Sequence, residues 1–130
     1  MARELSNPAD LHPATTYSHL AIAQGQTLVF VAGQVPFDKD RQIVGGDNLR
    51  EQTLAAMANV HTALKAAGCD WDNVVRRTIY TTLPHSLEEI TTAVRDATGG
   101  AANPPQSIVG VSGLALPGLL IEVECTAVRD

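Results

Sequence analysis

The distribution of apolar and polar residues along the chain predicts alternating strands and helices. Two short apolar runs, at 17–22 and 27–32, flank Gln24-Gly25-Gln26, which is typical of a β-hairpin. The second run is continuously apolar, so we expect its strand to be buried on both faces. Pro36 follows and ends the strand, because proline cannot donate a hydrogen bond to a central ladder.

A long helical pattern covers about residues 48–67. Asn48 is expected to cap its first turn, with Glu51 three residues later in the manner of a capping box. Gly68 is well placed as the C′ residue, where the left-handed conformation available to glycine ends a helix. The stripe that faces the core consists of Met57, Val60, Leu64 and Ala67.

A strand and a second helix come next. Residues 73–83 alternate between apolar and polar positions and are rich in Val, Ile, Thr and Tyr, as strands are. Ser86-Leu87-Glu88-Glu89 has the form of a capping box at the start of a helix. This helix carries an apolar stripe as far as Ala97, and Gly99-Gly100 end it.

Two last strands, at about 106–112 and 119–128, complete the order β-β-α-β-α-β-β. We therefore predict an α+β fold over a single domain of residues 1–130, with both helices on one face of a mixed sheet. The other face of the sheet must be covered as well, and the pattern offers no third helix for it. Self-association is the natural way to bury that face.

The last strand carries the most informative side chains. The opposite face from its apolar side chains presents Glu122 and Glu124. A carboxylate removed from water costs several kcal/mol unless it is paired or hydrogen-bonded. These two residues are therefore either exposed or paired strand residues, or they serve a pocket as a general acid/base or water-positioning group. The apolar face consists of Leu119, Ile121, Val123, Cys125 and Ala127.

Other residues have both a structural and a functional interpretation. Tyr17, at the start of the first strand, is either an amphipathic plug at a surface or interface or part of a site. Gly33, at a strand end, is either a turn residue or a point where a ligand approaches the backbone. Gln52 and Asn59 share a helix face, and side-chain hydrogen bonds to a neighbouring loop explain them more simply than ligand binding.

Composition and charge argue against several classes of protein. Of the 130 residues, 45% are hydrophobic and 18% are charged, which is ordinary for a globular domain. The formal net charge is −5, and the Lys and Arg residues are scattered, with Arg76-Arg77 the only adjacent pair. The chain is thus expected to bind neither nucleic acid nor an anionic membrane surface.

The sequence indicates neither a targeting segment nor a metal or cofactor site. The N-terminus lacks the apolar core of a signal peptide, and no apolar run approaches the ~20 residues of a membrane span, so we expect a cytoplasmic protein. Cys69 and Cys125 form no CxxC pattern and are expected to be reduced thiols. The four histidines show no metal-ligand spacing, and P-loop, GxSxG and GxGxxG motifs are absent.

Several segments together resemble the RidA (YjgF) family. They are Ala32-Gly33-Gln34-Val35-Pro36, Gln52-Thr53, Asn59-Val60, Ala66-Ala67-Gly68, Val74-Val75-Arg76-Arg77-Thr78 and Ile121-Glu122-Val123-Glu124-Cys125-Thr126-Ala127-Val128. The similarity covers almost the entire chain, in order and with matching spacing. It implies a homotrimer of α+β subunits whose sheets form a central barrel-like core, with small-molecule clefts between neighbouring subunits.

The resemblance also implies an activity and the residues of its site. The best-known activity of the family is hydrolysis of reactive enamines and imines to 2-keto acids and ammonia. Carried over by position, Tyr17 lines the cleft and Glu122 positions the attacking water. The substrate-gripping Arg of the family's Pro-x-Arg-Ser motif falls on Gln106, which is followed by Ser107. Backbone groups near Gly33 and Ser107 would orient the ligand.

The change at Gln106 alters the expected anchor for the ligand. An Arg offers a carboxylate a charged, bidentate fork, whereas Gln offers one neutral amide. Loss of a charge-assisted pair in a shielded pocket costs roughly 2–5 kcal/mol of binding free energy. Arg95 and Arg41 are remote in sequence, though the fold could bring either near.

Three hypotheses for function follow. The first is an enzyme that hydrolyses a small imine or enamine less anionic than the usual substrates, with Glu122 activating water and Gln106 binding a carbonyl or amide. The second is a non-catalytic metabolite-binding or interaction module of the same fold, which the Gln in place of Arg favours. The third is an endoribonuclease, an older label for some relatives, which the acidic charge and the lack of a basic, aromatic-lined surface disfavour.

Overall fold

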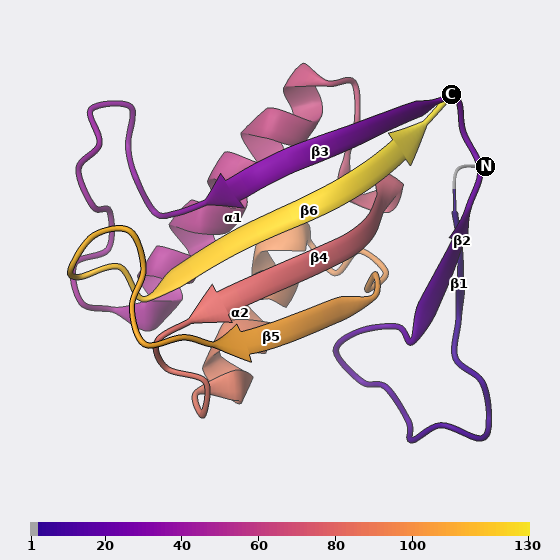
Figure 1. Ribbon diagram of the computed structural model, residues 1–130, viewed down its shortest axis with the longest axis horizontal. Coiled ribbons are helices and arrows are strands. Elements are labelled where there is room, and N and C mark those ends of the chain that lie inside the picture. Colours follow the sequence, from indigo (N-terminus) through magenta and orange to yellow (C-terminus); the bar gives the residue numbers. More distant parts are fainter. Residues whose placement is uncertain (1–2) are drawn as a thin grey trace.

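The computed structural model describes residues 3–130 (Figure 1). Its elements are β1 (Arg3–Ser6), β2 (Leu20–Ala23), β3 (Thr27–Gln34), α1 (Leu49–Ala66), the 3₁₀ helix η1 (Trp71–Asn73), β4 (Val74–Thr81), α2 (Leu87–Thr98), β5 (Gln106–Gly110) and β6 (Ile121–Arg129). This order adds the short strand β1 to the predicted series. Four residues are too few to show a hydrophobic period, so the sequence pattern did not predict this strand.

The main sheet has the strand order β3-β6-β4-β5. Its pairs are antiparallel except for β4 with β5, which run parallel. Both helices lie behind this sheet in Figure 1, in contact with each other. The predicted α+β fold, with two helices on one face of a mixed sheet, is confirmed.

The predicted hairpin between residues 17–22 and 27–32 is wrong. β2 pairs with β1 in a separate two-stranded sheet, whereas β3 pairs with β6. The connection at Gly25 lies against the end of β6, where a Cβ would come 2.8 Å from the carbonyl oxygen of Arg129. The chain therefore crosses from the small sheet to the main one at this glycine, and the long β6 supplies the ladder for β3.

The ends of α1 follow the sequence signals, but the start of α2 does not. Asn48 accepts a hydrogen bond from the backbone N–H of Glu51 at 2.8 Å, whereas the return bond from the Glu51 side chain that would complete the predicted capping box is absent within residues 3–130. Gly68 takes the left-handed conformation at φ +73°. Ser86 precedes α2 with ψ 43°, outside the extended conformation usual for a capping residue, and its side chain makes no cap bond. The capping box predicted at Ser86 is thus absent.

No helix within residues 3–130 has the length and apolar character that crossing a bilayer requires.

The core lies between the helices and the sheet, and β6 contributes its predicted apolar face to it. Ile121, Val123, Cys125 and Ala127 are all buried there. Cys125 and Cys69 are both buried free thiols. Burial raises the pKa of the Cys125 thiol to about 11, so this group stays protonated at neutral pH.

Gln52 and Asn59 hold loops against α1, as expected from their shared helix face. Gln52 is fully buried and donates to the carbonyls of Gly46 and Gly118, at 2.6 and 2.8 Å. Its oxygen accepts the backbone N–H of Leu120 at 2.8 Å. Asn59 donates to two carbonyls of the loop after β3, at 2.9 and 3.0 Å. Gln52 thus fixes the loop before α1 and the segment that leads into β6, and Asn59 fixes the loop after β3.

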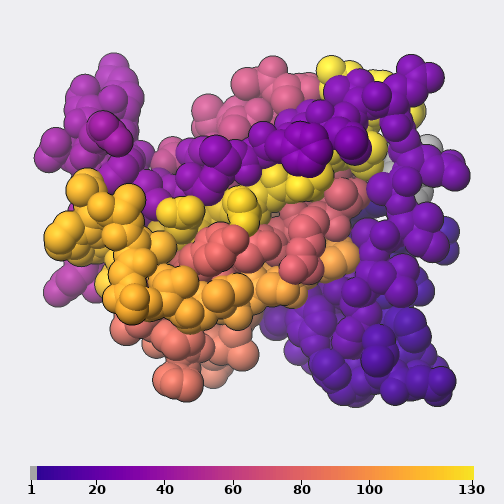
Figure 2. All heavy atoms as spheres, viewed as in Figure 1, coloured from indigo at the N-terminus to yellow at the C-terminus, as the bar shows by residue number. Residues whose placement is uncertain are grey.

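The second face of the main sheet is open in the single chain. Figure 2 shows strands β3, β6, β4 and β5 side by side on this face, without a helix over them. Phe30 and Leu28 of β3 are 74% and 60% exposed here. The expectation that this strand is buried on both faces is therefore wrong for one chain, because alternate side chains of β3 point away from the helices.

Candidate functional site

Glu122 is the second residue of β6, and its side chain lies on the open face of the sheet. It lies opposite Tyr80 of β4 in the strand register and is half-buried. Its carboxylate rests against Gly33 of β3, and a Cβ at that position would clash with it. The carboxylate has no hydrogen-bond partner within residues 3–130, so its oxygens are available to water or a ligand. Gly33 is thus a point of close approach as well as a strand residue.

The second carboxylate of β6 has a partner. Tyr80 donates a hydrogen bond from its hydroxyl to Glu124. This bond is the main reason why the pKa of the Tyr80 hydroxyl is raised. Further along the same face, Arg76 donates to the hydroxyl of Ser107 at 2.7 Å. The two glutamates predicted from the alternation are therefore different: within residues 3–130, Glu124 is paired and Glu122 is not.

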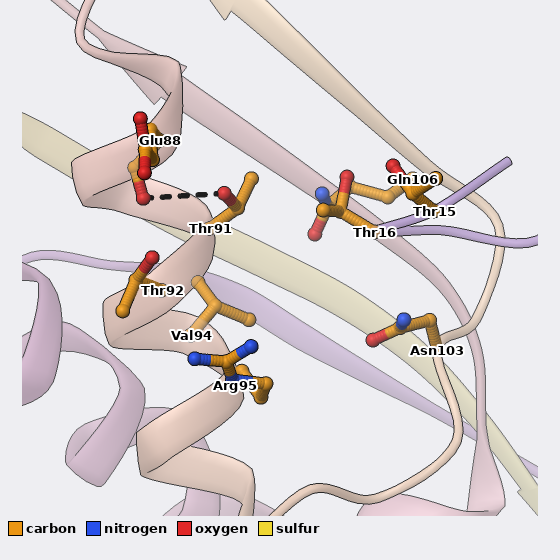
Figure 3. Close-up of a pocket in the computed structure, with 9 residues that line it drawn as sticks. All are labelled: Thr15, Thr16, Glu88, Thr91, Thr92, Val94, Arg95, Asn103 and Gln106. Atoms are coloured by element: carbon orange, nitrogen blue, oxygen red, sulfur yellow. Dashed lines mark hydrogen bonds between the residues drawn. The ribbon is translucent and has the colours of Figure 1, made fainter.

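Gln106 lines a cavity of about 270 Å³ on the helix side of the sheet (Figure 3). One wall is α2, and the opposite wall is made by the loop before β2 and the segment that leads into β5. In Figure 3, Gln106 reaches from β5 toward α2, beside Thr15 and Thr16. The lining residues are Thr15, Thr16, Glu88, Thr91, Thr92, Val94, Arg95, Asn103 and Gln106.

Arg77 lies behind Gln106 and is almost fully buried. Its Nε donates to the side-chain oxygen of Gln106 at 2.6 Å, across the parallel β4–β5 pair. Its Nη2 has no hydrogen-bond partner in the described part of the chain, and only 3% of the residue is exposed. Burial is the main reason why the pKa of Arg77 is lowered to about 10, which still leaves it cationic at neutral pH.

Tyr17 stands next to the cavity wall in the loop before β2. Its hydroxyl and the Nε2 of His12 share a hydrogen bond, and its ring meets that of His19 edge-on at 5.4 Å between centroids. Ser18 fixes this loop beside the start of β5: its hydroxyl donates to the carbonyl of Asn103 at 2.6 Å. The interpretation of Tyr17 as a plug and its interpretation as a site residue remain predictions.

The five predicted site residues do not form a single site within one chain. Glu122 and Gly33 meet at one end of the sheet on its open face. Gln106 is opposite Arg77, whereas Glu122 is opposite Tyr80, three residues further along β4 and on the other face. That step alone is about 10 Å. Ser107 alternates with Gln106 and so points to the open face, and Tyr17 lies beside the cavity.

Comparisons with known proteins identify the family of the chain. The model of the endoribonuclease L-PSP family matches residues 8–129. A Rid-family protein of unknown function from Yersinia pestis superimposes with a TM-score of 0.93 and 34% identity, over 98% of this chain and 99% of that one. A RutC-family protein of Pyrococcus abyssi is 34% identical over 91% of this chain and 90% of its own. The chain belongs to the RidA (YjgF) family.

A further relative has a described activity. The mouse 2-iminobutanoate/2-iminopropanoate deaminase is 35% identical to this chain over 68 residues, which are 52% of this chain and 50% of that protein. No group of three or more His, Cys, Asp or Glu within residues 3–130 is arranged to hold a metal ion.

Two arginines of this RidA-family chain belong to the cavity region and were not predicted as site residues. Arg95 lines the cavity directly, so α2 brings one of the two remote arginines to Gln106. Arg77 contacts Gln106 from behind. A signal for it was present in the sequence, since Arg77 falls in phase with Ile79 and Thr81, both of which are buried. A charged residue in the buried phase of a strand is uncommon and indicates a special role.

Proposed function

We propose that this RidA-family chain hydrolyses small reactive imines or enamines to keto compounds and ammonia. The observation that carries the proposal is the unpaired Glu122 carboxylate, held against the bare backbone at Gly33. A carboxylate in that setting can accept a proton from water and orient it, which is the role of a general base. The mouse relative, a deaminase of 2-iminobutanoate and 2-iminopropanoate, supports the reaction class.

The reaction consumes one water for each imine. The water oxygen bonds to the imine carbon while Glu122 accepts a proton, which then passes to the nitrogen. In the second step the C–N bond breaks and the hydroxyl proton goes to the departing nitrogen. A keto compound and ammonia leave, and the carboxylate is ready for the next water.

We also propose that the reaction takes place in clefts between the subunits of a homotrimer. Glu122 and Gln106 lie on opposite faces and at different positions along the sheet, so one chain does not bring them together. Gln106 begins the edge strand β5, so a second copy whose β5 edge meets the open face can supply it. The exposed Phe30 and Leu28 give that face the apolar surface that an obligate interface needs.

Phe30→Asp is expected to convert the trimer to monomers. It puts a carboxylate in the proposed interface, in place of an apolar side chain that is 74% exposed in one chain. Light scattering of both proteins at micromolar concentration measures the mass. Val109→Asp, on the same face but in β5 at the opposite edge of the sheet and only 39% exposed, is the matched comparison and should have a weaker effect. A wild-type monomer would contradict the proposed trimer.

The function is tested with 2-iminobutanoate, generated in the assay by a threonine dehydratase. Wild type is expected to release ammonia and 2-oxobutanoate faster than the uncatalysed reaction. Gln106→Arg alone would set a second guanidinium against Arg77, which contacts Gln106 at 2.6 Å. The better comparison is therefore the double variant Arg77→Gln/Gln106→Arg, which exchanges the two side chains.

The outcomes of this assay separate the hypotheses. Activity in wild type shows that Gln106 suffices as an anchor. An inactive wild type with an active double variant means that Glu122 is competent and that the natural substrate is less anionic. If both proteins are inactive while metabolites still bind, the chain is a non-catalytic metabolite-binding module. The neutral amide of Gln106 is the observation that favours this second candidate.

A further inference from the structure

We infer that Arg77 is a positioning residue for the ligand site: it turns the Gln106 amide so that the NH₂ group faces the cavity. The inference rests on the proposed function only in taking this cavity as the part of the cleft that receives the polar end of the ligand. It concerns how the Gln106 side chain is oriented, not the hydrolysis itself.

The chemistry of the two side chains fixes the direction of the amide. A guanidinium carries five donors and no acceptor, so only the oxygen of Gln106 can face Arg77. The contact joins Arg77 Nε to Gln106 Oε1 at 2.6 Å. The NH₂ group must then point away from Arg77, and Gln106 lines the cavity toward α2 (Figure 3). Without Arg77, the amide could present either its oxygen or its nitrogen to a ligand.

Stability alone does not explain Arg77, since its burial is poorly compensated. Its Nη2 lacks a partner within residues 3–130, and no carboxylate in that range forms an ion pair with it. The charged or titratable groups that act on it are Cys125, whose thiol is protonated, and Arg3, which is cationic. A buried charge with a single neutral acceptor costs folding free energy, so a role at the cavity explains its presence.

The positive charge of Arg77 also strengthens Gln106 as a donor. A hydrogen bond accepted by the amide oxygen polarises the amide, and the effect is larger where the dielectric is low. Among the residues that line the cavity, Arg95 is a cation, Glu88 is a carboxylate at the far end from Arg95 along α2, and Asn103 adds another amide. The polar end of the ligand is therefore an oxygen that accepts a hydrogen bond. Arg77 strengthens this bond by polarising the Gln106 amide that donates it.

The same contact makes arginine at positions 77 and 106 mutually exclusive. Two guanidiniums at the distance of the Arg77–Gln106 contact would repel each other in a buried setting. The neutral amide at 106 and the buried arginine at 77 thus form one device.

The test follows the Gln106 side-chain amide by ¹H–¹⁵N NMR during titration with 2-oxobutanoate. The Gln106 signals are those that disappear in Gln106→Met. They are expected to shift with 2-oxobutanoate and not with butanone, which has the same ketone and no carboxylate. Arg77→Met should weaken 2-oxobutanoate binding roughly 10-fold, because the Gln106 amide loses the charge-assisted hydrogen bond that holds its NH₂ group toward the ligand.

Two further variants keep the test independent of misfolding. Arg77→Lys retains a cationic donor for the amide oxygen and should bind within about 3-fold of wild type. Gln106→Glu still accepts from Arg77 but offers the cavity no donor, so it should fold and lose binding at least as far as Arg77→Met. Arg50→Met removes an exposed arginine that is paired with Asp96, and it should bind as wild type does.

Specific results would overturn the inference. One is a wild-type Gln106 amide that does not respond to 2-oxobutanoate. Another is Arg77→Met binding the probe as tightly as wild type. The proposed function fails separately: Arg77-dependent binding without imine hydrolysis leaves this inference standing, and hydrolysis that is indifferent to Arg77 removes the inference and leaves the enzyme.

Discussion

Glu122→Gln is expected to lower kcat/KM for imine hydrolysis by at least about 100-fold, the lower range for loss of a general base. The amide has the shape of the carboxylate but cannot accept a proton from water. Glu122 makes no hydrogen bond within residues 3–130, so the change removes no internal contact of the fold. The rate of ammonia release from 2-iminobutanoate, measured at several substrate concentrations, gives kcat and KM separately.

Glu124→Gln is the matched control for this prediction. It lies two residues along the same face of β6, and its amide oxygen can still accept the hydroxyl of Tyr80. The control should therefore retain activity, which shows that the loss at Glu122 is not a general effect of charge on this face. Equal losses in both variants would contradict the special role of Glu122.

The helices and the last strand could be predicted because their signals are local. In α1 the apolar stripe, the Asn48 cap and Gly68 all fall within one continuous segment, and the structure agrees with them except at Ala67, which follows the helix and is half-buried. In β6 the strict alternation ahead of Val128 separates buried from half-buried residues. Local hydrogen bonding and the period of the element set these features, so no tertiary information was needed.

Strand pairing depends on contacts that are distant in sequence. The hairpin predicted before α1 is wrong because β3 pairs instead with β6, about a hundred residues later, in a longer ladder. Nothing near Gly25 signals this exchange. The exposure of Phe30 has the same origin, since a continuous apolar run also fits a strand whose second face is covered by another chain.

The candidate site shows the same division. The alternation of β6 separates Glu122 from the core, but only the fold places Gly33 against its carboxylate. Arg77 depends on a shift of register between Val74 and Arg76, which changes the phase of β4 relative to its first residue. Its contact with Gln106 then follows from the parallel pairing of β4 with β5. Pairing of this kind cannot be read from either strand alone.

Arg77→Met is expected to raise the free energy of unfolding by about 2 kcal/mol, because replacing a buried, poorly paired charge by an apolar side chain of similar length is often stabilising. Methionine fills the same space, and Gln106 can turn its oxygen to water in the cavity. Urea unfolding of both proteins at one fixed concentration gives the comparison, since assembly makes apparent stability depend on concentration.

The pH dependence of this gain provides a second check. The folded pKa of Arg77 lies at about 10, well below the ordinary value of an arginine, so the unfolded chain binds more protons only between these two values. Stability of wild type should rise with pH in that window, and below it the penalty is fully present. The gain from Arg77→Met is therefore expected to be constant from about pH 6 to 9.

Arg50→Met, which breaks an exposed pair with Asp96 at 2.8 Å, should change stability by less than about 0.5 kcal/mol. A loss of stability in Arg77→Met would mean that the guanidinium anchors the assembled protein through acceptors on a neighbouring subunit, and that its burial serves assembly more than the cavity.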